Sequence, residues 1–189
     1  MQYGRPRSAA LTLLLLLCLA GGDGQAQQVP ILRDNALIEA ARAGDVETLK
    51  TALAAGQSAK LLGRNGQTAL HAASQWGRAE AVAVLLSDEV ALDKRAKDGH
   101  TALSYAVLRN NKEIVGQLLA AGADADRTGP NYEPPLVMAA RLGHDATVAA
   151  LLAARADVQA TDATGRTARD WALAKRHRKI LAALTASGG

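Results

Sequence analysis

One sequence pattern returns along this chain every 33 residues, and few folds accommodate such a period. The string Gly66-Gln67-Thr68-Ala69-Leu70 recurs as Gly99-His100-Thr101-Ala102-Leu103 and, in part, as Gly165-Arg166-Thr167-Ala168-Arg169. Positions that share this interval form what we call a column. One column consists of Leu37, Leu70, Leu103 and Leu136, and another of Leu53, Leu86, Leu119 and Leu152. The unbroken interval predicts an array of equivalent supersecondary units.

Composition favours an array as well. Of the 189 residues, 42 are Ala and none is Phe, and the aromatic content is 3%. So few large side chains fill one large core poorly, whereas Ala lets helices approach closely and loses no side-chain entropy in a helix. The single Cys, the 21% charge and the 49% hydrophobic content exclude disulfide-rich, collagen-like and disordered classes.

Each unit is predicted to be a pair of short helices. In the second unit, Thr68 is placed to cap a first helix over 69–75, and Gly77 separates it from a second helix over about 78–87. The second helix places three apolar side chains on one face at helical spacing: Val82, Leu85 and Leu86. No unit buries that face alone, so neighbouring units must stack.

A glycine is expected just past each second helix, where the backbone turns left-handed. Gly56 and Gly122 occupy this column. Glu89 and Arg155 replace glycine there in two units, at a cost of up to about 1 kcal/mol each.

These motifs resemble the ankyrin repeat family over residues 32–184. The family's threonine-proline-leucine-histidine signature stands here as Thr68-Ala69-Leu70-His71, and its closing leucine-rich, glycine-alanine-aspartate segment as Leu118–Asp124. The family's glycine between the two helices is present as Gly44, Gly77 and Gly143. The resemblance implies an all-α solenoid of five stacked helix-loop-helix units, joined by β-turn or hairpin tips. The expected repeats span about 32–64, 65–97, 98–130, 131–163 and 164–187, within a domain over 27–189.

The N-terminus is predicted to be an export signal over residues 1–26. Arg5 and Arg7 precede an apolar stretch over 9–20, and Gly24-Gln25-Ala26 offers the small residues that a signal peptidase reads. The apolar stretch is shorter than the roughly 20 residues of a membrane-spanning helix. We therefore expect an exported protein, periplasmic in a Gram-negative host, without a membrane span after cleavage.

Cys18 leaves a lipoprotein as the alternative, which Leu17 disfavours because lipid-modification motifs prefer a small residue before the cysteine. Because Cys18 is the only cysteine, the cleaved chain would hold no thiol for disulfides, catalysis or metal binding. Cleavage also removes two arginines and one aspartate, so the net charge changes from +4 to +3. This excess is too small to indicate nucleic-acid binding.

Both ends of the array depart from the pattern. The first unit begins Asp34-Asn35-Ala36 and lacks the turn glycine, while the last carries Arg169 in the leucine column and a basic run over Lys175–Lys179. Terminal units need a polar outer face, so we interpret these two as caps. The basic run is typical of a solvated helix face.

The residues indicate no catalytic or metal-binding centre. His71 lies in the signature column, and His144 and His177 share another, so the repeat accounts for three of the four histidines. No pair of ligands has metal-binding spacing on one helix face, and the glycines follow the period rather than a phosphate loop. We expect no enzyme, no cofactor and no metal. A carboxylate pair assembled across repeats is the open alternative.

The resemblance implies that a protein partner binds the tips and the exposed side of the first helices, which form one concave face. Carried over by column, the tip positions are Arg64, Asn65, Gln67, Lys97, Asp98, His100, Pro130, Asn131, Glu133, Ala163, Thr164 and Arg166. The helix positions are Gln75, Trp76, Leu108, Arg109, Arg141, Leu142, Ala174 and Lys175. The six Arg and Lys side chains among these residues predict an acidic partner surface.

Aromatic and apolar side chains on the same face are typical of interface centres. Trp76, Leu108, Tyr132 and Leu142 are the predicted anchors. Trp171 and Tyr105 lie in inward columns and are predicted to pack within the array. Tyr132 replaces the turn glycine, and Pro134 replaces the capping threonine, so this tip is the first place to expect partner contact.

The predicted function is an exported, non-catalytic and monomeric module that binds another protein. The chain is similar to small signal-bearing bacterial ankyrin proteins, some of which accompany a periplasmic catalase and support resistance to oxidative stress. The alternative is an immunity or inhibitor protein that blocks a toxin or enzyme in the same compartment.

Overall fold

The computed structural model describes residues 35–87 and 90–187, and within them the chain forms ten α-helices arranged as five pairs. The first helices of the pairs are α1 (Ala36–Ala43), α3 (Ala69–Gln75), α5 (Ala102–Leu108), α7 (Pro135–Leu142) and α9 (Ala168–Lys175). The second helices are α2 (Val46–Ala54), α4 (Ala79–Leu86), α6 (Lys112–Ala120), α8 (Asp145–Ala153) and α10 (Arg178–Ser187). The all-α stack of five units is confirmed.

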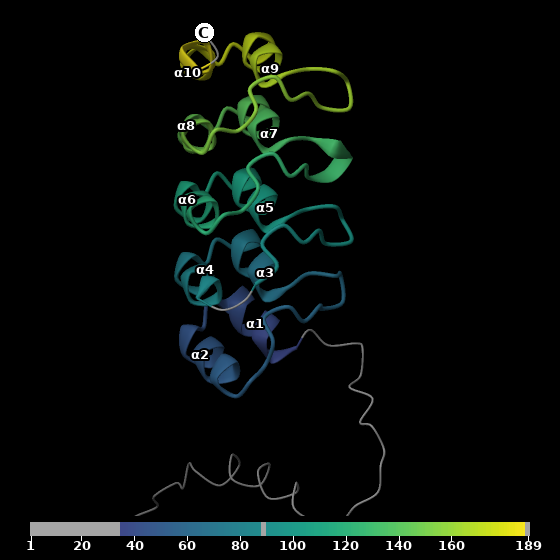
Figure 1. Cartoon of the computed structure of the whole chain (residues 1–189), viewed down its shortest axis with the longest axis vertical. Coiled ribbons are helices and arrows are strands. Elements are labelled where there is room, and N and C mark those ends of the chain that lie inside the picture. Colours follow the sequence, from purple (N-terminus) through teal and green to yellow (C-terminus); the bar gives the residue numbers. More distant parts are fainter. Residues whose placement is uncertain (1–34, 88–89, 188–189) are drawn as a thin grey trace, which may run out of the picture. The chain divides into compact units, whose positions relative to one another are not determined.

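The two sets of helices form two parallel stacks, and the loops between units project from the side of the first helices (Figure 1). One 3₁₀ helix, η1 (Pro130–Tyr132), lies in such a loop. Over 35–87 and 90–187 no strand forms, although Thr161 and Thr167 make a single antiparallel bridge. None of the described helices is long and apolar enough to cross a membrane. The predicted signal segment and Glu89 lie outside the described residues.

Threonine caps start three of the five first helices. The hydroxyl oxygens of Thr68, Thr101 and Thr167 each accept a hydrogen bond from the backbone amide three residues later, and the side chain of that third residue bonds back to the threonine amide. This reciprocal arrangement satisfies two amides that a helix start leaves without partners. Asn35 caps α1 through its side chain. Pro134 gives α7 no side-chain cap, so neither Asn131 nor Glu133 replaces the missing threonine.

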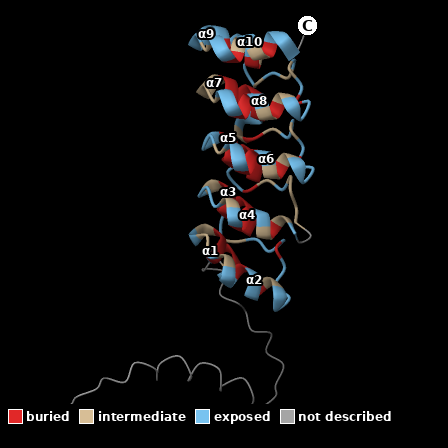
Figure 2. Ribbon diagram, turned by 90° about the vertical axis from the view of Figure 1, so that its left-hand side faces the viewer, coloured by how far each residue is buried: buried red, intermediate tan, exposed pale blue. Residues whose placement is uncertain are grey.

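The leucine column is the centre of the core. Leu37, Leu70, Leu103 and Leu136 are each 1% exposed, whereas Arg169 in the same column is exposed. First helices pack on first helices and second helices on second helices along the array, and Figure 2 shows buried residues in every layer. Each leucine is therefore covered by its own unit and by a neighbouring one.

The column between the two helices of each unit is left-handed throughout. Gly44, Gly77 and Gly143 have positive φ, and Asn110 and Arg176 adopt φ of 53° and 61° in the same column. Gly56 and Gly122, past the second helices, have positive φ as predicted. Past the second helices, Arg155 also turns left-handed, with a φ of 62°. A residue with a Cβ atom adopts this conformation at a cost of about 1–2 kcal/mol, so the repeat geometry overrides local preference at these positions.

Four loop tips, each closed by a backbone hydrogen bond between its first and fifth residues, join the units. We number them from the N-terminus as tip 1 (63–67), tip 2 (96–100), tip 3 (129–133) and tip 4 (162–166). In each, the amide of the first residue donates to the carbonyl of the fifth, over 2.8 to 3.0 Å. The Lys97 amide also donates to the Asn65 carbonyl, so tip 1 and tip 2 are held side by side.

The C-terminal unit is only partly polar on its outer side. Leu173 is 53% exposed, although Ala41, Ser74 and Ala140 in its column are buried. Leu173 also helps to line a hollow of about 300 Å³ with Leu181. Among the described residues, no further unit covers this column, which explains the difference from the earlier units.

We predict that Leu103→Ala lowers the free energy of unfolding by about 2–5 kcal/mol, because it removes side-chain volume from a fully packed position. Arg169→Ala at the same column position should change it by no more than about 0.5 kcal/mol, because Arg169 is exposed. Urea unfolding followed by circular dichroism measures both variants. Equal effects of the two substitutions would show that the column is not a continuous core.

Candidate functional site

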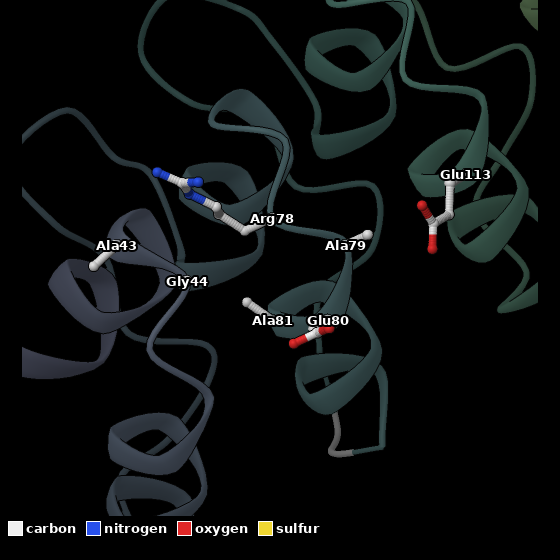
Figure 3. Close-up of a pocket in the computed structure, with 7 residues that line it drawn as sticks. All are labelled: Ala43, Gly44, Arg78, Ala79, Glu80, Ala81 and Glu113. Atoms are coloured by element: carbon white, nitrogen blue, oxygen red, sulfur yellow. The ribbon is translucent and has the colours of Figure 1, made fainter.

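Two hollows on the described surface are open and do not bring catalytic side chains together. Both touch charged side chains, and their volumes are about 350 and 380 Å³. In the first of these, the charged ends of Arg78, Glu80 and Glu113 lie apart; Arg78 and Glu80 come from the start of α4 and Glu113 from α6 (Figure 3). The Arg78 guanidinium is used locally, because its Nε donates to the Arg42 carbonyl at 3.1 Å. Over 35–87 and 90–187, no group of three His, Cys, Asp or Glu side chains could hold a metal ion.

The tips and the exposed ends of the first helices form one continuous surface, which we call the tip face (Figure 1). The structure places most of the residues predicted for partner binding there. Exposed on it are Arg64, Asn65, Trp76, Lys97, Leu108, Arg109, Tyr132 and Arg166. Half-buried are Gln75, His100, Glu133, Arg141 and Leu142, and buried is Gln67.

Gln67 was expected at an exposed tip, but its side chain is turned into the array and is 8% exposed. Its Nε2 donates to the Tyr105 hydroxyl at 2.7 Å and to Gln75 Oε1 at 3.2 Å. The physical reason is the buried phenol of the next unit, which needs a hydrogen-bond partner. Gln67 therefore positions other residues and offers no side-chain surface to a partner.

Tyr105 is the centre of this polar network. Its hydroxyl donates to the Asp98 carboxylate, and its ring stacks on the His100 imidazole with 4.4 Å between ring centroids. Burial raises the pKa of Tyr105, and the hydrogen bond to Asp98 raises it further, so the phenol stays neutral. The prediction that Tyr105 packs inside the array is confirmed. With Gln67, it ties tip 1 and tip 2 to helix α5.

His71 is fully buried and holds the second unit together. Its Nδ1 accepts a hydrogen bond from the Thr68 amide at 3.1 Å, and its Nε2 lies 2.9 Å from the Lys94 carbonyl. Burial lowers the pKa of His71 below its ordinary value, although the bond to the Lys94 carbonyl opposes this. His100 also has a lowered pKa, again because of burial. Both rings are therefore neutral at pH 7.

Tip 3 holds the most unusual backbone on the tip face. Asn131 and Tyr132 have φ of 55° and 58°, in succession, where tips 1, 2 and 4 use a single glycine. Tyr132 is 73% exposed, and its ring centroid lies 6.0 Å from the Arg95 guanidinium carbon. Arg95 donates to the Thr128 hydroxyl and to the Gly129 carbonyl, so it fastens the base of tip 3 to the preceding unit.

A cluster of cations surrounds Trp171 at the other end of the face. The Arg166 guanidinium lies 4.8 Å from the ring centroid, and Arg141 and Lys175 lie 5.9 Å from it. The indole Nε1 donates to Asp162 Oδ2 at 2.7 Å. The expectation that Trp171 packs against the array is confirmed, because it is half-buried against the core.

Two residues that shape the tip face were not predicted from the sequence. Arg95 shares its column with Leu62, Thr128 and Thr161, so no repeated signal singles it out. Asp162 accepts hydrogen bonds from its own tip and from Trp171. Desolvation opposes the charged form of Asp162, but hydrogen bonds from the Thr164 hydroxyl, the Trp171 indole and the tip amides outweigh it and lower its pKa to about 2.

We predict that the free energy of unfolding falls as the pH is lowered from 7.5 to 5. His71 and His100 have folded-state pKa values below the ordinary 6.5, so the unfolded chain takes up more protons in this range. Their stabilising effect is complete above pH 6.5 and is lost as the pH falls towards the folded-state values. Asp162 titrates near pH 2, well below this window.

Thermal unfolding at intervals of pH measures this effect, with His71→Gln as the matched variant. Because Gln does not titrate, the variant should be less stable at pH 7.5 and should lose less stability on acidification. A wild-type chain whose Tm is unchanged or higher at pH 5 would contradict the neutral, buried histidine.

The comparison with known families agrees with this geometry. A family model described as "Ankyrin repeats (3 copies)" matches residues 37–129 and again residues 103–189, so the two matches cover 37 to 189 without a gap. No curated protein sequence matches the chain. Ankyrin repeats are modules that bind other proteins. The unbroken period, the five helix pairs and the matched residues show that this chain belongs to the ankyrin repeat family.

Proposed function

We propose that this protein is an exported, non-catalytic module that binds one protein partner through its tip face. The observation that carries the proposal is Tyr132, an aromatic side chain that is 73% exposed on a backbone with a φ of 58°. A large side chain in the left-handed region is a strained arrangement, and residues held in such regions cost about 1–3 kcal/mol and cluster at functional sites. Glycine serves the same position in tips 1, 2 and 4 without strain.

Other apolar anchors extend this surface across the array. Trp76 is 51% exposed at the end of α3, and Leu108 is 43% exposed at the end of α5. Exposed aromatic side chains and arginines are the residues that most often dominate binding energy. With Tyr132 they give three consecutive units one apolar side chain each, so the proposed contact spans several units.

The charge of the tip face favours an acidic partner surface. Lys97, Arg109, Arg166 and Lys175 are exposed on it. The acidic residues there are engaged by the protein itself: Asp98 accepts from Tyr105, Glu133 pairs with Arg141, and Asp162 accepts from Trp171. Complementary charge mainly accelerates and selects association.

The compartment and the role of the partner complete the proposal. Export rests on the signal-like segment over residues 1–26 and on the absence of Cys from the remaining sequence. We propose that the partner is an enzyme of the same compartment, such as a catalase, which the module supports against oxidative stress. The second candidate is an inhibitor or immunity protein, which the cationic tip face favours because it suits an acidic target.

We predict that Tyr132→Gly raises the free energy of unfolding by up to about 1 kcal/mol, because glycine adopts a positive φ without strain. The same variant should capture less of the partner from the exported fraction, because the exposed ring is gone. Urea unfolding and quantitative affinity capture measure the two effects. A variant that is destabilised and still binds fully would assign Tyr132 to structure instead.

We predict that the double variant Trp76→Ala and Arg109→Glu loses at least tenfold of its affinity for the captured partner, since it removes an anchor and reverses a charge. Lys112→Ala, on the exposed start of α6 outside the tip face, is the matched control and should bind as the wild type does. Equal capture by the double variant and the control would rule out the tip face as the interface.

The role of the complex is decided by the activity of the captured enzyme. Higher activity or better survival in peroxide supports the accessory role, while loss of activity on complex formation supports the inhibitor. Turnover of a substrate by the purified chain alone would contradict a non-catalytic module.

A further inference from the structure

Three cationic side chains from two units meet on one indole ring at tip 4. Arg141 comes from α7, Arg166 from tip 4 and Lys175 from the end of α9, and all three lie within 6 Å of the Trp171 ring centroid. Cations over an aromatic face are attracted by the ring quadrupole, by about 0.5–1 kcal/mol where they are exposed. Arg166 and Lys175, which form no salt bridge within the described residues, also repel one another, so this arrangement attracts negative charge.

The carboxylates near Trp171 neutralise only part of this positive charge. Glu133 is fully engaged by Arg141, which donates from Nε to Oε1 at 2.7 Å and from its terminal nitrogen to Oε2 at 3.0 Å. Asp162 is occupied by the tip 4 amides, by the Thr164 hydroxyl and by the Trp171 indole. Within the described residues, no carboxylate forms a salt bridge with Arg166 or Lys175.

The backbone that carries each of these two cations is also held in place. The Arg166 amide donates to Asp162 Oδ1 at 3.1 Å, which fixes the backbone of this residue in tip 4. Lys175 is the last residue of α9, whose next residue, Arg176, turns left-handed and ends the helix. Between them Trp171 is half-buried against the core, with its indole nitrogen bonded to Asp162. An apolar floor therefore lies between two cations that form no salt bridge within the described residues, although Arg166 is close enough to the exposed Asp170 to help lower the pKa of that carboxyl.

We propose that Arg166, Lys175 and Trp171 form a receptor for an acidic segment of the partner protein, in which two carboxylates meet the cations and an apolar side chain covers the indole. This inference rests on the proposed function and adds the chemistry of the partner to it. Arginine binds a carboxylate through two parallel N–H groups, and lysine supplies a compact charge. The Arg141–Glu133 pair beside them is neutral overall. It therefore offers no further site for a carboxylate, so the segment needs only a few acidic residues.

The same features disfavour a nucleic acid. A polyphosphate chain carries evenly spaced charge and needs a long basic track, whereas Glu133 and Asp162 interrupt the cations here. Recognition of single strands also uses exposed aromatic platforms, and Trp171 is half-buried. A short protein segment with alternating acidic and apolar residues is a better match for two cations on either side of the Trp171 ring.

The test uses the fluorescence of Trp171. The chain contains two tryptophans, so Trp171 is the only one left in a Trp76→Phe background, in which all chains are compared. The probe is an acetylated, amidated octapeptide of alternating glutamate and leucine, titrated into the full chain. We expect a saturable change in Trp171 emission. The peptide with glutamine in place of glutamate should give none.

The variants assign that signal to the two cations. Arg166→Ala and Lys175→Ala should each raise the Kd at least fivefold, and Arg166→Lys should restore part of the loss because it keeps the charge. Lys112→Ala should leave the Kd unchanged. Melting curves check that each variant folds. The proposal is overturned by no saturable signal up to about 5 mM peptide, by an equal response to the glutamine peptide, or by unchanged binding in the alanine variants.

Two further comparisons distinguish this inference from a nucleic-acid site and from the proposed function. Tighter binding of an eight-nucleotide single-stranded DNA than of the acidic peptide, lost in the same variants, would overturn the choice of a protein segment. If Tyr132→Gly weakens partner capture while the Arg166→Ala, Lys175→Ala double variant captures fully, the proposed function stands and the receptor fails. If the peptide requires both cations but Tyr132→Gly, Trp76→Ala and Arg109→Glu do not affect capture, the receptor stands without the proposed function.

Discussion

The burial of one leucine in each of the first four units, between neighbouring helix pairs, is the interaction on which the rest of this structure depends. Leu70 and Leu103 are buried only because the units stack, since a two-helix unit is too thin to enclose its own apolar face. The cost of ordering each short helix is met only when the next unit stacks on it. The tips carry little of this core, and they are therefore open to other chemistry.

The stack also imposes left-handed backbone at fixed positions, and the chain meets that demand in two ways. At Gly77 and Gly143 it uses glycine, whereas Asn110 and Arg176 accept the strain. These two lie between helices, where every unit has a left-handed residue. Tyr132 differs, because it lies at a loop tip whose three counterparts are all glycine. The backbone is left-handed at this position in all four tips, and only tip 3 places a large, exposed aromatic side chain there.

The tip face has two chemically different halves. Around Tyr105 the polar groups satisfy one another: burial keeps the phenol and His100 neutral, and Asp98 is engaged. Around Trp171, Arg166 and Lys175 form no salt bridge within the described residues. The first half gives the surface a fixed shape, and the second gives it charge. A partner that is apolar at one end of its contact and acidic at the other suits both halves.

The sequence by itself determined the repeat, the helix pairs, the threonine caps and the leucine column, because these depend on local hydrogen bonds and on a periodic apolar face. The bounds predicted for the second unit, 69–75 and about 78–87, agree with α3 and α4. Only the tertiary structure decided that Gln67 turns inward to Tyr105, that Arg95 fastens tip 3 and that three cations converge on Trp171. These contacts join residues of different units or of separate parts of one unit. The 33-residue period predicts which positions lie close together, but it does not predict the direction in which each side chain points.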